Sequence, residues 1–573
     1  MATDDPQQGQ VLSTTIDKNG RYESHATLGS PGCSGDHMYV GNTQAIPIVF
    51  LPGIMGSPLI ATGKNAGTIK NDDVGKNWAW FPDSHSWLGL SISGQTGYRD
   101  LNAAKRKQLL DPDNTRAVTT PQDADISTWK GLLDKHAYVH LDEAMRRGWG
   151  SVLCSGYGDF MLWLEDHLEH LYFEGKPHAA AAYKRTDAHA WGEVKGYEAV
   201  TDAELVKAAN WRYPVYAIGY NWLQSNKDSA QKVVQRIASI QADCRQRLKL
   251  KCDKVIIVTH SMGGLVGRMA AKLAPDLIWG VVHGVQPATG AGTAYQHVRE
   301  GYADFVGSLV IGGSGDLITP IFANASGCLE LLPNKQYGPG WMIVNYQEPG
   351  GTLRQLFSLP DPGTSPYAQI YAKGDQWWRL MHPGLVDPGT KNLSASWGQY
   401  LDRLGVAESF HTALGDYYHP TTYAYYGASS DKKAWQKINW NLISLSDMST
   451  GVSAKAPSAD VAKNGMTLTR DDLQSYAEIQ NKASAGLIMY AGADGVGRTA
   501  NYSGDAYRAR IGVPDDEGDG TVPAHSGSAL TSYVRFCARM TGFDHQGSYA
   551  NDAVRSLTLH SVIKIAQQAV DLC

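Results

Sequence analysis

The sequence lacks the features that mark membrane-spanning, Sec-exported and nucleic-acid-binding proteins. Its longest apolar stretches, such as the one that begins at Ile46, are shorter than the roughly 18 residues of a membrane-spanning helix. The N-terminal segment MATDDPQQGQ has neither the basic start nor the apolar centre of a Sec signal, so we expect synthesis in the cytoplasm. No run rich in lysine and arginine occurs, and the formal net charge is −5. Nucleic acid is not expected as a partner, because its binding depends on neutralising phosphates.

Cysteine is also scarce, with seven in 573 residues. No two cysteines stand at metal-ligand spacing, and an odd number leaves at least one unpaired. These observations predict neither a disulfide framework nor a structural zinc site. In contrast, hydrophobic residues make up 43% of the chain, and there are 61 glycines, 16 tryptophans and 29 tyrosines. This composition indicates a large core, many turns and a partly aromatic surface.

Alternating strand and helix patterns in the middle of the chain predict an α/β fold with a mostly parallel sheet and flanking helices. Short apolar runs indicate buried strands, and amphipathic segments between them indicate helices. Strands are expected at residues 46–51, 215–220, 254–260 and 279–285, and helices at 228–248, 264–274 and 561–572.

The most informative pattern is VIIVTHSMGGLVGRM, in which an apolar strand leads through Ser261 directly into a helix. A serine at such a sharp turn projects its hydroxyl from the edge of the sheet, and the residues two positions away have to be small. Gly263 meets this requirement, whereas Thr259 stands where glycine is usual. The turn also places the N–H of Met262 at a helix N-terminus, where it can donate to an oxyanion. The pattern favours a nucleophile elbow over a chance serine between a strand and a helix.

A second pattern, FLPGIMGS, follows the first expected strand and contains Gly53 and Gly56. Serine hydrolases take another backbone donor from the loop after an early strand. Glycine lets such a loop approach the substrate carbonyl closely. Ile54, directly after Pro-Gly, is the expected second donor of an oxyanion hole.

An activated serine also needs a histidine that accepts its proton and a carboxylate that orients the histidine. In α/β-hydrolases both follow the serine, the acid before the histidine. Asp519 stands in the turn EGDGTVP, and His545 stands in the loop FDHQGSYAND before the last expected helix. Taken alone, each is typical of an ordinary turn or loop. Their order after Ser261 favours Asp519 as the acid and His545 as the base. The alternatives are Asp316 as the acid and His525 or His560 as the base, with His560 inside a helical pattern.

These residues span almost the whole chain, yet they have to meet in one site. Residues 1–44 are polar and indicate a loosely packed lead-in. We therefore interpret residues 45–573 as one catalytic domain with large helical cap or lid insertions at about 60–210 and 340–500.

A short acidic cluster precedes the candidate acid. Asp515, Asp516 and Glu517 are adjacent, and carboxylates are the ligands that calcium prefers. A solvated loop is the favoured interpretation of such a cluster. We therefore expect no cofactor and no metal, with calcium at these residues as the alternative.

Four segments together resemble a known group of enzymes. FLPGIMGSPL, VTHSMGGLV, GDGTVP and DHQGSY, in this order, resemble bacterial lipases related to the GPI inositol-deacylase-like and lecithin–cholesterol-acyltransferase-like α/β-hydrolases. Within that group they are most similar to phospholipase effectors delivered by type VI secretion, as are HGVQPATGAGTAY and LELLPN. The resemblance covers the core segments, roughly half of the chain. It implies an α/β-hydrolase fold with Ser261 as nucleophile, Asp519 as acid, His545 as base, and Ile54 and Met262 as oxyanion donors.

The resemblance also implies a function. The expected activity is serine-dependent hydrolysis of a lipid ester, foremost as an A1-type phospholipase that acts as a secreted antibacterial toxin. The alternatives are a neutral-lipid or ester lipase, an inositol-deacylase-like esterase, and a non-catalytic binding protein of the same fold. The implied partners are membrane phospholipid as substrate, a cognate immunity protein and a component of the secretion spike. The implied destination is the periplasm or membrane of a target cell.

Two aromatic runs lie within the expected insertions. NWAWFPDSHSW begins at Asn77, and DQWWRLM begins at Asp375. Tryptophan is suited to contact with lipid head groups and also to the buried core of an insertion. For any single tryptophan the buried core is the favoured interpretation, and head-group contact is the alternative.

Overall fold

The computed structural model of the chain describes most of the sequence. It describes residues 43–65, 77–84, 97–135, 139–173, 176–177, 191–301, 314–348, 351–444 and 506–569, and the strands at 14–16, 22–24, 466–469, 484–491 and 497–504. The lead-in expected at residues 1–44 therefore lies largely outside the described residues. None of the described helices combines the length and the hydropathy of a membrane span.

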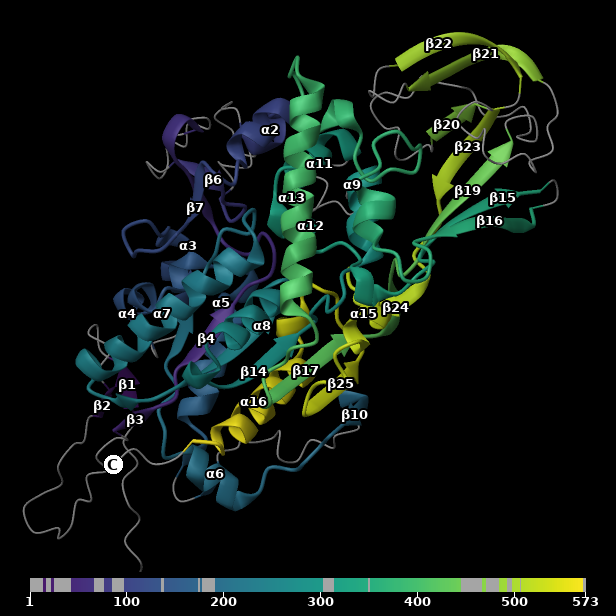
Figure 1. Cartoon of the computed structure of the whole chain (residues 1–573). Coiled ribbons are helices and arrows are strands. Elements are labelled where there is room, and N and C mark those ends of the chain that lie inside the picture. The colour runs from purple at the N-terminus through teal and green to yellow at the C-terminus, as the bar shows by residue number, and fades with distance from the viewer. Residues whose placement is uncertain are drawn as a thin grey trace, which may run out of the picture.

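A mostly parallel sheet of seven strands forms the centre of the molecule (Figure 1). Its strands, in spatial order, are β10 (Glu193–Lys195), β25 (Phe536–Met540), β17 (Thr422–Gly427), β14 (Ile278–Gly284), β13 (Val255–His260), β4 (Ile48–Leu51) and β11 (Val215–Ala217). Only β10, at one edge, runs antiparallel to its neighbour. All six residues of β13 are buried, as expected for a central strand of a parallel sheet with both faces covered.

Helices cover both faces of this sheet. The α-helices are α2 (Ala103–Leu109), α3 (Ser127–Leu133), α4 (Leu141–Arg146), α5 (Cys154–Glu169), α6 (Asp202–Ala208), α7 (Asn226–Gln246), α8 (Gly263–Leu273), α9 (Gly292–Glu300), α11 (Gly315–Phe322), α12 (Ser326–Leu329), α13 (Leu393–Leu414), α15 (Ala524–Ser528) and α16 (Asp552–Ala566). On β13 the side chain of Thr259 points towards Gly267 of α8, whereas on β14 Gly280 lies against Ile565 of α16. The side chain of His283 bonds to Thr259 and therefore lies on the same face as α8. Successive side chains of a strand alternate between the faces, so Gly280, three positions before His283, faces the other side. Helices α8 and α16 therefore lie on opposite faces of the sheet.

A second sheet lies to one side of the first (Figure 1). Its five strands, in order, are β16 (Leu353–Leu359), β15 (Met342–Gln347), β19 (Ile438–Ser444), β23 (Ala506–Ile511) and β20 (Met466–Thr469). The remaining strands form small sheets: β1 (Thr14–Ile16) with β2 (Tyr22–Ser24), β3 (Gln44–Ala45) with β12 (Lys251–Cys252), β5 (Leu59–Ala61) with β6 (Trp78–Trp80) and β7 (Thr115–Ala117), β8 (Tyr172–Phe173) with β9 (Lys176–Pro177), β18 (Ser429–Ala434) with β24 (Asp516–Gly518), and β21 (Ser484–Ala491) with β22 (Gly497–Gly504).

The structure differs from the insertions expected from the sequence. In its described residues, the segment 60–210 contains helices α2 to α6 and strands β6 to β10, and β10 belongs to the central sheet. The segment 340–500 contains β17, a central strand of that sheet, and most of the second sheet besides helix α13. Strand β17 was missed because TYAYYG is a tyrosine-rich run that neither alternates nor resembles the aliphatic strands.

The two aromatic runs belong to the core rather than to a lipid-facing surface. The tryptophans Trp78, Trp80, Trp377 and Trp378 are all buried. Trp80 donates from Nε1 to the carbonyl of Met55 at 2.7 Å, and Trp78 stacks on Phe81. The head-group interpretation is therefore wrong for these four side chains, while Trp87 lies outside the described residues.

Candidate active site

Ser261 occupies a strained turn between β13 and α8. Its φ of +52° lies in the left-handed region, which is unfavourable for a residue with a side chain. A Cβ at Gly263 would lie 2.4 Å from the carbonyl oxygen of Pro52, so only glycine fits there. A Cβ at Gly264 would lie 2.7 Å from Cγ of Gln286. Glycine is therefore required at both positions, at Gly263 by the backbone of the loop after β4 and at Gly264 by the side chain of Gln286.

Thr259 fits the turn despite its size because α8 makes room for it. A Cβ at Gly267 would lie 2.8 Å from the methyl carbon of Thr259. The Thr259 hydroxyl and Nδ1 of His283 are 2.9 Å apart. The crowding expected at Thr259 is therefore relieved by a glycine eight positions later in the chain, and the elbow keeps its shape.

Three side chains from distant parts of the chain meet at this turn. Nε2 of His545 lies 2.8 Å from Oγ of Ser261, and its Nδ1 lies 2.7 Å from Oδ2 of Asp519. A carboxylate accepts hydrogen bonds, so Nδ1 of a neutral His545 carries the proton and Nε2 is free to accept from the serine hydroxyl. This is the arrangement in which a serine is activated by general-base catalysis.

The backbone holds the acid and the base in register. Oδ1 of Asp519 accepts from the N–H groups of Thr521 and Val522 at 3.0 and 2.7 Å. The N–H of His545 donates to the carbonyl of Asp519 at 2.8 Å. A Cβ at Gly427, the last residue of β17, would lie 2.7 Å from Cβ of Asp519. The acid turn therefore packs directly on the end of a central strand.

The loop after β4 lies against the serine. A Cβ at Gly53 would lie 3.1 Å from Cβ of Ser261. Met55 has a φ of +63°, and the N–H of Gly56 donates to the carbonyl of Gly53 at 3.1 Å, so the loop is a tight turn. Within the described part of the chain, the backbone N–H groups of Ile54 and Met262 donate no hydrogen bond. Met262 directly follows Ser261, and Ile54 directly follows Gly53, which lies against the serine. The two N–H groups expected to bind an oxyanion are therefore unengaged by the described residues.

The alternative bases are bonded elsewhere, and the alternative acid lies on a helix that packs on α2 and α9. Asp316 stands in the first turn of α11. Nε2 of His525 bonds to the carbonyl of Tyr337 at 2.9 Å, and Nε2 of His560 bonds to the carbonyl of Glu198 at 2.9 Å. The structure does not bring any of the three to Ser261.

The acidic cluster is divided among different partners. Asp515 accepts from two backbone N–H groups at 3.0 Å, Asp516 accepts from the N–H of His525, and Glu517 pairs with Arg539. Across the described ranges, no group of three or more histidine, cysteine or acidic side chains is arranged to hold a metal ion. The geometry therefore favours a structural role for these carboxylates.

The three meeting side chains are enclosed. Ser261, His545 and Asp519 are 5%, 4% and 1% exposed. Enclosure strengthens electrostatic interactions at the hydroxyl, because water no longer screens them.

A solved structure matches this chain over most of its length. A chain of the structure described as "The crystal structure of Tle4-Tli4 complex" aligns with a TM-score of 0.68 and 26% identity, over 92% of this chain and 99% of the other. This chain is similar to a chain of the Tle4–Tli4 complex. The match reaches well beyond the roughly half of the chain that carries the sequence resemblance, so the likeness to that complex includes the insertions as well as the sheet.

Other comparisons add little. The structure described as phospholipase PlaB from Legionella pneumophila covers 54% of this chain and 76% of its own, with 11% identity and a TM-score of 0.16. No family model and no curated protein matches the sequence.

Two residues beside the serine were missed by sequence reasoning. His260 was assigned only to the end of a strand, and Tyr157 lies in a helix with no motif of its own. Both are buried and bonded to each other. Adjacency to Ser261 was the one available signal for His260, and no local pattern marks Tyr157.

Proposed function

We propose that this chain is a serine-dependent ester hydrolase. The observation that carries the proposal is the bridge that His545 makes between Ser261 and Asp519, at 2.8 and 2.7 Å, with the serine held at a φ of +52°. A degenerate fold that only binds a ligand has no need to preserve this strained and buried arrangement.

The chemistry follows from the positions of the protons. Oγ of Ser261 attacks the ester carbonyl while Nε2 of His545 takes the hydroxyl proton. The N–H groups of Met262 and Ile54 donate hydrogen bonds to the carbonyl oxygen and stabilise the negative charge that develops on it. The alcohol leaves with the proton from His545, and water then hydrolyses the acyl-enzyme by the same path in reverse.

The proposed substrate is a lipid ester, foremost a phospholipid cleaved at the sn-1 position. The sequence resemblance to phospholipase effectors supports this choice, and the extensive match to a chain of the Tle4–Tli4 complex supports a common architecture.

The proposed setting is that of a toxin with a dedicated inhibitor. The matching structure contains two named proteins, Tle4 and Tli4. By analogy, this chain would have one binding partner in the producing cell, an immunity protein, and a spike component that delivers it to the periplasm of a target cell. No cofactor is proposed.

The decisive experiment is mass spectrometry of products from a phosphatidylethanolamine with different acyl chains at sn-1 and sn-2. Wild type is compared with Ser261→Ala and with Ser229→Ala, a control that removes a buried serine hydroxyl on α7. We expect release of the sn-1 chain by wild type and the control, and a loss of at least about a thousandfold in Ser261→Ala. Retention of more than about a hundredth of the activity by Ser261→Ala would overturn the assignment.

Parallel assays separate the alternatives. Turnover of triacylglycerol but not of phospholipid would favour a neutral-lipid lipase, and release of acyl groups from inositol would favour an inositol-deacylase-like esterase. Absence of fluorophosphonate labelling of Ser261 in folded protein would favour a binding protein.

A further inference from the structure

A continuous hydrogen-bonded chain crosses the site beneath Ser261. The N–H of Gly53 lies 3.1 Å from the hydroxyl of Tyr157, and that hydroxyl lies 3.1 Å from Nδ1 of His260. Nε2 of His260 lies 2.8 Å from the backbone carbonyl of His545. The chain therefore joins the loop after β4 to the loop that carries the base, through the residue next to Ser261.

Each atom in this chain has only one consistent role. The carbonyl of His545 can only accept, so Nε2 of His260 carries the proton. Burial, together with the neighbouring His545, lowers the pKa of His260 to about 3, so the imidazole is neutral and Nδ1 accepts. The Tyr157 hydroxyl then donates to Nδ1 and accepts from the N–H of Gly53. Every donor in the chain therefore meets an acceptor.

The glycines of the loop after β4 are shaped around the same two side chains. A Cβ at Gly53 would lie 2.8 Å from Nδ1 of His260. A Cβ at Gly56 would lie 2.9 Å from both Cε2 and the hydroxyl oxygen of Tyr157. The loop that carries Ile54 thus wraps tightly around the Tyr157 hydroxyl.

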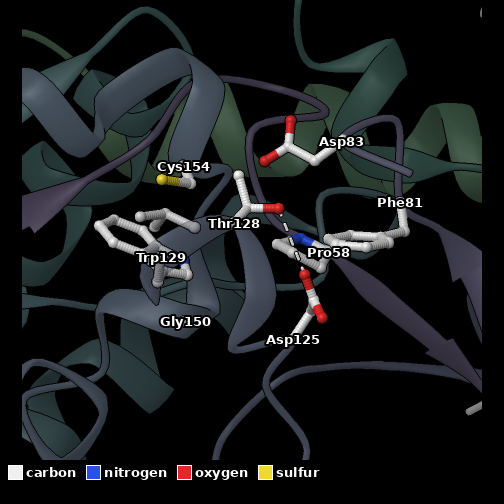
Figure 2. Close-up of a pocket in the computed structure, with 9 residues that line it drawn as sticks. Pro58, Phe81, Asp83, Asp125, Thr128, Trp129, Gly150 and Cys154 are labelled. Carbon is white, nitrogen blue, oxygen red and sulfur yellow. Dashed lines mark hydrogen bonds between the residues drawn. The ribbon is translucent and has the colours of Figure 1, made fainter. Parts of the chain in front are cut away.

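Tyr157 stands on a helix that is itself anchored at its start. The N–H of Leu153 donates to the carbonyl of Gly56 at 3.0 Å, so the loop and α5 are joined at two points. Asp83 accepts from the N–H and the hydroxyl of Ser155 in the first turn of α5. Figure 2 shows Asp83 and Cys154 beside the small cavity at this end of the helix. The hydroxyl of Tyr157 is therefore presented from a fixed support.

We propose that His260 and Tyr157 are positioning residues. They hold the loop after β4, which carries Ile54, and the loop that carries His545 in fixed positions relative to each other. The proposal rests on the proposed serine hydrolysis. His260 fixes the position of the His545 backbone by its bond to the His545 carbonyl. Tyr157 fixes the position of Gly53, which directly precedes Ile54, by its bond to the Gly53 N–H. Neither touches substrate. Loss of either link lets one half of the site move relative to the other, and displacements of about 1 Å cost roughly a hundredfold in rate.

Substituting His260 by asparagine or by glutamine separates its two hydrogen bonds, the one between Nδ1 and Tyr157 and the one from Nε2 to His545. The amide of asparagine reaches the place of Nδ1, so His260→Asn keeps a partner for Tyr157 and loses the bond to His545. The amide of glutamine reaches the place of Nε2, so His260→Gln keeps the bond to His545 and loses Tyr157. Tyr157→Phe removes the central hydroxyl alone and leaves the ring packing on Phe50 and His260.

The test measures kcat and KM on a soluble short-chain nitrophenyl ester, together with the rate of fluorophosphonate labelling of Ser261. We expect kcat and the labelling rate to fall about 10- to 100-fold in each variant, with KM within about threefold of wild type. His260→Gln combined with Tyr157→Phe should fall no further than His260→Gln alone, because the pair acts as one unit.

Matched controls separate positioning from general loss of stability. His560→Asn removes an equivalent bond from a buried histidine Nε2 to a backbone carbonyl, and Tyr400→Phe removes a buried hydroxyl bonded to the carbonyl of Tyr371. Both should leave kcat within about twofold of wild type.

Each outcome bears on one claim. Labelling rates of Tyr157→Phe and both His260 variants equal to wild type, or equal losses in the two controls, would overturn the positioning role. An additive double variant would overturn the single chain. No hydrolysis and no labelling of Ser261 by wild type would instead overturn the proposed function.

Discussion

Replacing His283 by asparagine removes a buried titratable group from the middle of the central sheet. His283 is 1% exposed, and its Nδ1 bonds to the hydroxyl of Thr259 at 2.9 Å. Burial, and the nearby guanidinium of Arg268, lower the pKa of His283 to about 3. Asparagine can offer its amide oxygen to Thr259, so the substitution chiefly deletes the ionisable ring.

The magnitude follows from the two states of this imidazole. An unfolded histidine has a pKa of about 6.5, so between pH 7.5 and pH 5 it binds a proton that the folded imidazole does not take. The unfolded state binds more protons, so stability falls as pH falls through the window from about 6.5 towards 3. Over the interval from pH 7.5 to pH 5, His283 should lower the free energy of unfolding by about 2 kcal/mol.

The assay is urea unfolding followed by tryptophan fluorescence at several pH values, for wild type and His283→Asn. The smaller side chain lowers stability equally at all pH values, so the informative quantity is the change in the difference between the two proteins. We expect the difference to shift by about 2 kcal/mol in favour of the variant on acidification. A constant difference between wild type and His283→Asn from pH 7.5 to pH 5 would refute the reasoning.

Three further changes test the site and its support. Asp519→Asn should lower kcat about 10⁴-fold with an unchanged melting temperature, because the amide stabilises the wrong tautomer of the histidine. Gly267→Ala should lower the free energy of unfolding by about 1–3 kcal/mol through its contact with the Thr259 methyl, and adding Thr259→Ser should recover most of the loss, as measured by urea unfolding. Arg147→Met should cost about 3–5 kcal/mol in the same assay, because it leaves buried Glu165 without its 2.6 Å ion pair.

These three expectations have distinct contradicting results. Near-normal turnover by Asp519→Asn would show that Asp519 is not the acid that orients His545. A strictly additive double substitution at Gly267 and Thr259 would show that the helix and the elbow are not in steric contact. A neutral Arg147→Met would show that burial alone keeps Glu165 uncharged; burial already raises its pKa to about 7.

Local chemistry made much of the sheet and the elbow predictable. The strands expected at 254–260 and 279–285 correspond to β13 and β14, and the helix expected at 228–248 corresponds to α7, with Ser225 as its N-cap. These elements depend on periodicity and on backbone angles that a few neighbouring residues set. The aliphatic runs also differ clearly from their surroundings.

Elements without such local marks were not predictable. Strand β17 lacks an aliphatic pattern, yet it is buried between β14 and β25 and supports Asp519 through Gly427. The tryptophans that began as candidates for a lipid surface are buried, because neighbouring segments in space cover them. Burial of an amphipathic side chain is decided by what packs on it, and periodicity cannot report that.

By itself the sequence determined which residue types could carry the chemistry: a serine on a glycine-lined turn, an acid and a histidine downstream, and a glycine loop after the first strand. Only the tertiary structure decided that Ser261 and His545, 284 positions apart, lie within hydrogen-bonding distance. It alone placed Tyr157 between the two loops of the site. The physical reason is that a turn is fixed by local sterics, whereas a hydrogen bond between distant segments depends on the packing of every layer between them.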